Sequence, residues 1–330
     1  MLRSDRRSIL FMLSREPSDI PDAEARTLVA DLDPDAKFEK PEPGLLVAHS
    51  SADPSTIESR VAFSRRVGLL VPDADLDEPT VSMLRRGTYR VRVFGEVRDE
   101  YEEREIISSV AERVEGKVSL KEPDMEVSAY VSGDTGKTYF ALTMPGMMRQ
   151  GWATRRPRSR AYFHPSAIFP KLSRALVNFS GVQPGEVFVD PFCGTGSLLI
   201  EASIVGADSV GVDMAKKMVR GSRRNSIKYG QPWLGIIRAD SRSLPVREVS
   251  GISTDIPYGR AASAGGLESS ELLRCLVAGA QDVLPMGRKL VVMHPKTLKV
   301  EPGAFDIERE LDIYVHRTLT RTISVMRRTL

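Results

Sequence analysis

The sequence predicts an α/β protein whose C-terminal half forms a doubly wound, largely parallel β-sheet, preceded by smaller α+β units. From about residue 160 onward, helical stretches alternate with short apolar strands, which is typical of a parallel sheet with helices on both faces. Before that point, short strands and helices alternate around turn-rich stretches. A chain of 330 residues is long enough for two or three such domains.

The first predicted domain spans residues 1–70. Its apolar runs and helical spacings predict strands at 8–13 and 44–48 and helices at 21–32 and 54–66. A second domain, 71–146, follows the turn-rich stretch VPDADLDEPT. Its pattern predicts strands at 88–97, 125–131 and 137–142 and a helix at 103–114.

Residues 147–165 are predicted to be a linker and residues 166–330 a third domain. The strand candidates of this domain are 187–189, 209–212, 235–238, 251–254 and 289–293. The last two segments, 305–315 and 316–326, are expected to add an antiparallel pair at the sheet edge.

Composition excludes several classes of protein. Apolar residues make up 41% and charged residues 28%, as in ordinary globular domains. With only Cys193 and Cys275, neither a disulfide framework nor a four-thiolate zinc site is possible within one chain, and we predict no metal. The sequence has no run of about 18 apolar residues and no signal-like start, so we expect no membrane association and a cytoplasmic location.

Positive charge is concentrated in two places, although the net charge is only +3. The stretch 149–160 contains five arginines and no acid, and the C-terminus adds Arg317, Arg321, Arg327 and Arg328. Arginine pairs with phosphate through its planar fork and stacks on bases, which favours a nucleic acid partner. A solvated linker is an equally good explanation of charge alone. The predicted RNA-binding residues are Arg149, Arg155, Arg156, Arg158, Arg160 and Lys171.

The most informative segment is VFVDPFCGTGSLLIEASIVG, residues 187–206. A strand ends at Asp190, a loop contains Gly194 and Gly196, and a helix follows, an order that brings backbone amides close to a nucleotide-type ligand. The third glycine of the dinucleotide fingerprint and the lysine of a phosphate loop are both absent. An acid at the strand end would repel a pyrophosphate but is compatible with the cationic S-adenosylmethionine.

Two more acids end the next two strands. Asp213 follows the second strand, from which a carboxylate can accept both ribose hydroxyls, and Asp240 follows the third, within reach of an adenine amine. A glycine loop alone is often a structural turn, but three acids at successive strand ends favour a cofactor site.

The fourth strand ends in Asp255-Ile256-Pro257-Tyr258. In open α/β sheets this end of a strand faces the ligand crevice. The Asp255 carboxylate and the Ile256 carbonyl are two acceptors that would hold an amine so that its nitrogen lone pair becomes nucleophilic. Pro257 stiffens the turn and Tyr258 offers a stacking face. The alternative is an ordinary exposed turn.

These residues resemble a known family. DPFCGTGSLLIEA followed by DIPYGR is similar to the amino-methyltransferases with an Asp/Asn-Pro-Pro-Tyr signature, and most closely to the archaeal tRNA guanosine-10 N2-methyltransferases. The likeness covers most of residues 160–260, whereas 117–133 only loosely resembles a THUMP RNA-binding domain. Ile256 stands where the usual signature has proline.

The resemblance implies that ferredoxin-like and THUMP domains precede a Rossmann-like methyltransferase domain in the sequence. It also implies tRNA as partner and S-adenosyl-L-methionine as cofactor. An accessory activator protein is not excluded. The catalytic residues would be Asp255, Ile256, Pro257 and Tyr258, and the cofactor-binding residues Phe163, Asp190, Pro191, Gly194, Thr195, Gly196, Asp213, Met214, Asp240 and Ser241. The alternatives are methylation of another RNA guanine, of DNA adenine N6 or of a protein glutamine, and a non-catalytic RNA-binding protein.

Overall fold

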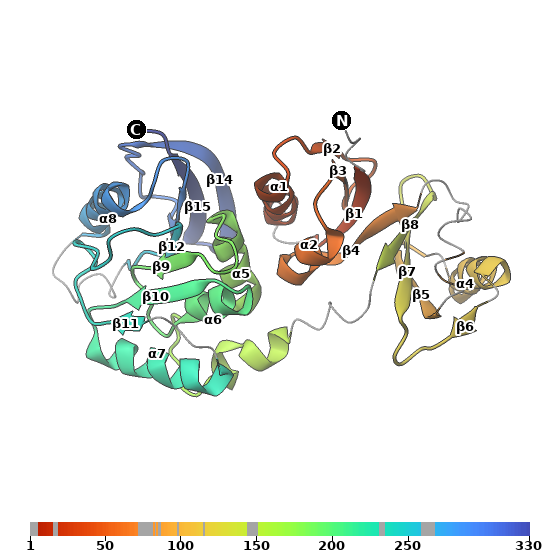
Figure 1. Ribbon diagram of the computed structural model, residues 1–330, viewed down its shortest axis with the longest axis horizontal. Helices are drawn as coiled ribbons and strands as arrows, with labels where there is room; N and C mark the ends of the chain where they lie inside the picture. The colour runs from red at the N-terminus through yellow and green to blue at the C-terminus, as the bar shows by residue number, and fades with distance from the viewer. Residues whose placement is uncertain are drawn as a thin grey trace. The chain divides into compact units, whose positions relative to one another are not determined.

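The computed structural model divides into two compact units, residues 1–150 and residues 151–330 (Figure 1). It describes residues 6–15, 19–71, 82, 84, 87–97, 99–114, 116–143, 151–230, 235–258 and 268–330. Among the described helices, none has the length and apolar character needed to cross a membrane.

The first unit is built on an eight-stranded sheet in the order β2-β3-β1-β4-β8-β7-β5-β6. Three helices in it are α1 (Ile20–Leu32), α2 (Pro54–Arg60) and α4 (Glu100–Val114). The strands are β1 (Arg7–Leu13), β2 (Lys37–Glu39), β3 (Leu45–Ser50), β4 (Ser64–Val71), β5 (Thr88–Gly95), β6 (Lys117–Val118), β7 (Met125–Val131) and β8 (Thr138–Thr143).

One sheet thus runs through both domains predicted for this part of the chain. β4 pairs with β8 antiparallel, with Leu69 opposite Leu142. Three apolar clusters lie along the sheet, one around Phe11 and Leu28, one around Leu10 and Val47, and one around Tyr89 and Val110. Residues 1–150 therefore form one unit in which a single sheet carries several cores.

The helix predicted at 54–66 is too long. Asp53 caps α2, its carboxylate accepting from the Thr56 amide, but the helix ends at Arg60 and Val61 is already extended. β4 then starts at Ser64 and pairs with β1. Tertiary pairing outweighs the weak helical spacing of residues 61–66.

The second unit confirms the predicted α/β fold. Its seven-stranded sheet has the order β11-β10-β9-β12-β13-β15-β14, in which β9 to β13 are parallel and β15 is antiparallel to both of its neighbours. The strands are β9 (Val187–Asp190), β10 (Asp208–Val212), β11 (Gly235–Ile237), β12 (Gly251–Asp255), β13 (Lys289–Pro295), β14 (Phe305–His316) and β15 (Leu319–Arg328).

Helices cover both faces of this sheet. α5 (Pro170–Phe179) and α6 (Ser197–Ile204) lie on the other side of it from α8 (Ser269–Val283) (Figure 1). α7 (Lys216–Tyr229) connects β10 to β11. The buried face of α8, including Leu276 and Ala280, packs with Ile252 and Val292 of the central strands.

Most of the predicted linker, 147–165, belongs to this second unit. Residues 151–165 lie within it, and they begin with the short helices η1 (Trp152–Arg155) and η2 (Pro157–Ser159). The apparent linker composition is misleading because two of its arginines, Arg155 and Arg160, are buried.

Candidate active site

The glycine loop joins β9 to α6 at the carboxyl end of the sheet. Gly194 and Gly196 have φ angles of 50° and 81°, the left-handed region that glycine adopts without strain. The Cys193 amide donates to the Val212 carbonyl at 2.9 Å, which fixes the loop to the end of β10. A side chain at Gly194 would point into open space, its nearest neighbour being the Phe192 carbonyl at 4.0 Å. A ligand can therefore approach this backbone closely.

The first two strand-end acids hold the ends of β9, β10 and β12 together. Asp213 accepts from the amides of Gly194 at 3.0 Å and Ala215 at 2.8 Å. Asp190 accepts from the Thr254 hydroxyl at 2.7 Å and the Phe192 amide at 3.2 Å.

Electrostatics shows that the acids of neighbouring strands lie close to one another. Burial, together with the charges of Asp213 and Asp255, raises the pKa of Asp190 to about 7 against the opposing hydrogen bonds from Thr254 and Phe192. Burial also raises the pKa of Asp213, opposed by its two backbone hydrogen bonds. Such an acidic site disfavours phosphate and fits the positive charge of S-adenosylmethionine.

The end of the third strand differs from the prediction in one respect. Asp240 is paired with Arg242, whose Nε lies 2.8 Å from its carboxylate, and this pairing lowers the Asp240 pKa. The Ser241 hydroxyl donates to the Pro191 carbonyl. Ser241 is therefore joined to the glycine loop, whereas the Asp240 carboxylate already has a cationic partner.

The side-chain amide of Asn225 joins the segment that contains Phe163 to the glycine loop. Asn225 on α7 accepts from the Tyr162 amide at 2.8 Å and donates to the Thr195 carbonyl at 2.9 Å. Phe163 itself is 46% exposed and Met214 is 48% exposed. These two apolar side chains are available to a flat ligand such as adenine.

The Asp-Ile-Pro-Tyr segment begins at Asp255, the last residue of β12. Asp255 is half-buried, and Ile256 lies in the core. The Ile256 amide donates to the Met293 carbonyl at 3.0 Å. Burial raises the pKa of Asp255 to about 6, against the opposing charge of Arg321. Within the described structure, the buried Oδ1 of Asp255 has no hydrogen-bond partner.

Arg321, on β15, contacts both ends of that segment. One guanidinium nitrogen lies 3.2 Å from Asp255 Oδ2, and another donates to the Tyr258 hydroxyl. The guanidinium carbon also lies 5.2 Å from the centre of the Tyr258 ring. Sequence reasoning counted Arg321 only among the C-terminal basic residues, because its position follows from the register of β15 against β13.

Two arginines predicted to bind RNA are buried structural residues instead. Arg155 and Arg174 both pair with Glu201, at 2.7 Å and 2.8 Å, and both lie over the Trp152 ring. Arg160 donates to the Ser197 hydroxyl at 2.6 Å and to the Ile168 carbonyl at 3.0 Å. A buried charge needs these partners, so Arg155 and Arg160 are unavailable to phosphates.

Three other residues predicted to bind RNA are accessible to solvent. Arg156 and Arg158 are exposed and Lys171 is partly exposed. Arg149 lies outside the described residues. Within the described part of the chain, no group of His, Cys, Asp and Glu has the arrangement of a metal site.

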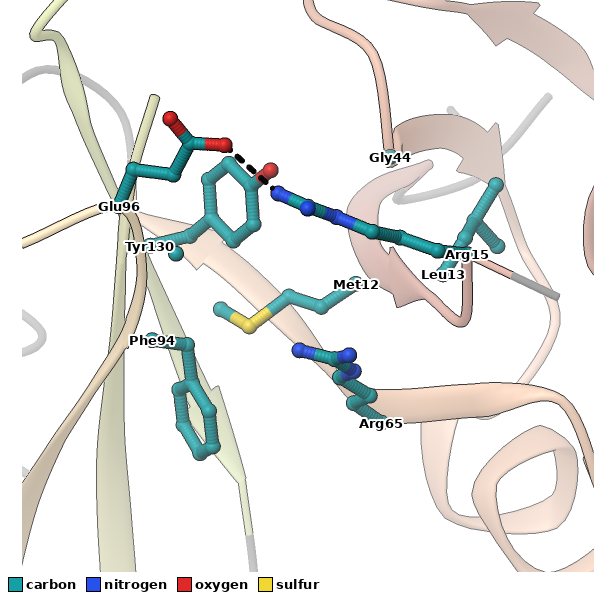
Figure 2. Close-up of a pocket in the computed structure, with 9 residues that line it drawn as sticks. Met12, Leu13, Arg15, Gly44, Arg65, Phe94, Glu96 and Tyr130 are labelled. Atoms are coloured by element: carbon teal, nitrogen blue, oxygen red, sulfur yellow. Dashed lines mark hydrogen bonds and ion pairs between the residues drawn. The ribbon is translucent and has the colours of Figure 1, made fainter. Parts of the chain in front are cut away.

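The first unit has a pocket of about 250 Å³ (Figure 2). An Arg15–Glu96 ion pair of 2.8 Å crosses it. Its lining contains none of the predicted catalytic or cofactor residues and consists of Met12, Leu13, Arg15, Gly44, Arg65, Phe94, Gly95, Glu96 and Tyr130. The acidic strand ends of the second unit remain the better candidate for chemistry.

Comparison with known proteins shows the family to which the chain belongs. Residues 157–304 match the family described as UPF0020, RMKL-like, methyltransferase domain. A tRNA (guanine(10)-N2)-dimethyltransferase of Methanothermobacter thermautotrophicus is 32% identical over 97% of this chain and 99% of its own length. The chain belongs to this family of tRNA guanine-N2 methyltransferases.

Two further proteins are similar to this methyltransferase. A tRNA (guanine(6)-N2)-methyltransferase of Thermus thermophilus is 28% identical over 79% of this chain and 78% of its own. The crystal structure of TrmN from Thermus thermophilus has a TM-score of 0.51 at 19% identity, covering 98% of this chain and all of that one. This structural likeness shows the shared fold.

Proposed function

We propose that this methyltransferase transfers methyl groups from S-adenosylmethionine to N2 of guanosine 10 in tRNA, giving N2-methyl- or N2,N2-dimethylguanosine. The names of its relatives support both the substrate and the position. The structural observation that carries the proposal is the buried Asp255 Oδ1, an acceptor without a partner among the described residues.

An exocyclic amine needs help to act as a nucleophile, since its lone pair is delocalised into the purine ring. When bound, S-adenosylmethionine supplies an electrophilic methyl group on a sulfonium. In the first transfer, Asp255 Oδ1 accepts one N–H of the amine and the Ile256 carbonyl accepts the other, and the proton that the nitrogen loses on gaining the methyl group passes to Asp255. These two contacts favour a pyramidal nitrogen with its lone pair directed along the reaction axis. Tyr258, held by Arg321, offers its ring to the flipped base.

The other residues divide by their role. Asp190, Pro191, Gly194, Thr195, Gly196, Asp213, Met214, Ser241 and Phe163 hold the cofactor, and Asp240 contributes from its pair with Arg242. Residues 71–146 act as a THUMP domain that binds tRNA. In the sequence, this domain follows a ferredoxin-like part, residues 1–70. The enzyme works in the cytoplasm.

The test uses unmodified tRNA transcripts, labelled cofactor and this chain alone. Mass spectrometry of the nucleosides should show methylated guanosine that disappears when guanosine 10 is replaced by adenosine. A product that instead disappears when guanosine 6 is replaced would assign the activity named for the Thermus relative. Activity without another protein would also show that no activator is needed. Asp255→Ala should abolish the product.

A further inference from the structure

Helix α7 has an unusual charge distribution. Its sequence, KKMVRGSRRNSIKY, contains six cations and no acid over 14 residues. The six cationic residues are Lys216, Lys217, Arg220, Arg223, Arg224 and Lys228, and each of them is exposed. By comparison, α4 mixes both signs and pairs Arg104 with Glu100.

The cations of α7 share one face. With 3.6 residues per turn, the six fall within an arc of about 140° that also contains Ile227. Ile227 is 81% exposed. The opposite side packs inward through Val219, Ser222 and Asn225. The exposed face, which we define by the six cations and Ile227, is about 20 Å long.

This face is unfavourable for the helix itself. The pairs 216/220, 220/224 and 224/228 place like charges four residues apart, each destabilising by a few tenths of a kcal/mol. Lys216 and Lys217 occupy the first turn, where the helix dipole favours acids, and that turn has none. In the described structure, none of the six is paired with a carboxylate. A face that only needs solvation would gain from acids at these positions.

The basic face is continuous with the exposed arginines of the segment before α5. The Tyr229 hydroxyl donates to the Thr154 carbonyl at 3.0 Å, and the Lys228 ammonium donates to the Ser159 carbonyl. Arg156 and Arg158 therefore extend the face at the C-terminal end of α7. In Figure 1, residues 152–159 lie next to that end of the helix.

The other end of the face is at the cofactor site. α7 begins at Lys216, directly after Ala215, whose amide is bound by Asp213. A polyanion lying along α7 would thus reach Asp213, which is bound to the glycine loop.

We propose that the exposed face of α7, with Arg156 and Arg158, binds the phosphate backbone of the tRNA substrate next to the active site. The proposal rests on the proposed function for the identity of the RNA. With Arg156 and Arg158, five of the eight cations are arginines and all the charge is of one sign. Ile227 is the one exposed large apolar side chain of α7, so the face fits a phosphate chain better than a lipid surface.

The test removes three cations that make no backbone contact. The variant Lys217→Gln/Arg220→Gln/Arg224→Gln keeps Arg223 and Lys228, which bind backbone carbonyls. The control variant Arg247→Gln/Arg274→Gln/Lys299→Gln removes the same charge from exposed positions elsewhere in this unit. Fluorescence anisotropy measures the Kd for unmodified tRNA between 50 and 300 mM salt, and calorimetry measures cofactor binding.

The α7 variant should bind tRNA about 10- to 100-fold more weakly, and the slope of log K against log salt should fall by about two to three. Its cofactor affinity should not change, and its melting temperature should stay the same or rise because like-charge repulsion is relieved. The control variant should bind tRNA within twofold of the parent.

Equal tRNA affinity of the α7 variant and the parent would overturn the proposal, as would an equal loss in both variants. Sedimentation with phosphatidylserine vesicles that depends on α7, while tRNA binding does not, would assign the face to membranes instead. Failure of the proposed function appears separately, as an absence of methylated guanosine in the parent enzyme, because the binding assay needs no turnover.

Discussion

Arg321 on β15 forms an ion pair of 3.2 Å with Asp255 on β12, across the intervening strand β13. Within the described residues, the other carboxylate oxygen of Asp255 has no hydrogen-bond partner. The same guanidinium binds the Tyr258 hydroxyl. One side chain of β15 therefore holds the Asp255 carboxylate and the Tyr258 ring together. Because it contacts both of these side chains, we expect Arg321 to act as a positioning residue for the methyl transfer.

Replacing Arg321 should reduce the rate of methylation more than substrate binding. In Arg321→Met, Asp255 and Tyr258 lose their shared partner, and a displacement of about 1 Å at the reacting groups lowers a rate about 10- to 100-fold. Single-turnover kinetics should show this loss with cofactor affinity nearly unchanged, and Arg321→Lys should recover part of it. The matched control is Arg327→Met on the same strand, which breaks a partly exposed pair with Glu308. If both methionine variants lose activity equally, the loss reflects β15 and not the Asp255 contact.

The rate should depend on pH through Asp255. Its pKa is raised to about 6 by burial and held down by Arg321. The ionised carboxylate is the acceptor, so the rate should fall as pH drops through about 6 and level off above it. Removing the cation in Arg321→Met should move this acid limb to higher pH, because the opposing charge is gone. A limb that stays in place in pH-rate profiles of both enzymes would belong to another group.

Much of the fold could be predicted from the sequence, since parallel strands and the glycine loop leave local signals. The strand-end acids Asp190, Asp213 and Asp255 were found because such ends share one edge of a parallel sheet. The sequence does not indicate which ion-pair partner each arginine has, and this partner determines whether the arginine is structural, exposed or part of the site. Arg155, Arg156 and Arg321 look alike in sequence, yet one is buried on Glu201, one is exposed, and one reaches the active site through strand register.

Replacing neighbouring arginines should therefore change the free energy of unfolding by very different amounts. Arg155→Met leaves the buried Glu201 with Arg174 and without one of its two cations, which should cost about 3 kcal/mol of unfolding free energy. Arg156→Met changes an exposed residue and should cost less than about 0.5 kcal/mol. Urea unfolding of the two variants measures this difference. Similar values would mean that the Glu201 cluster contributes little to the second unit.

Cofactor affinity should depend on Asp213 and not on Asp255. Asp213→Ala removes the carboxylate that would accept the ribose hydroxyls and also releases the Gly194 amide. We expect at least a tenfold higher Kd for S-adenosylmethionine by calorimetry, whereas Asp255→Ala should bind within a fewfold of the parent. Unchanged affinity in Asp213→Ala would place the cofactor elsewhere on the sheet.

Restoring the usual signature with Ile256→Pro should harm this enzyme. Proline lacks an amide hydrogen, so the Ile256–Met293 hydrogen bond of 3.0 Å would be lost and a buried carbonyl left without its partner, at a cost of about 1–3 kcal/mol. Ile256 is also fully buried, so the change of side chain adds to this cost. Ile256→Val keeps the amide, and its loss of about 1 kcal/mol measures the side-chain contribution alone. Thermal unfolding should rank the parent above the valine variant and the valine variant above the proline variant, with no gain in methylation rate for proline. A proline variant that is both more stable and faster would show that this amide contributes nothing and that the loop benefits from a stiffer backbone.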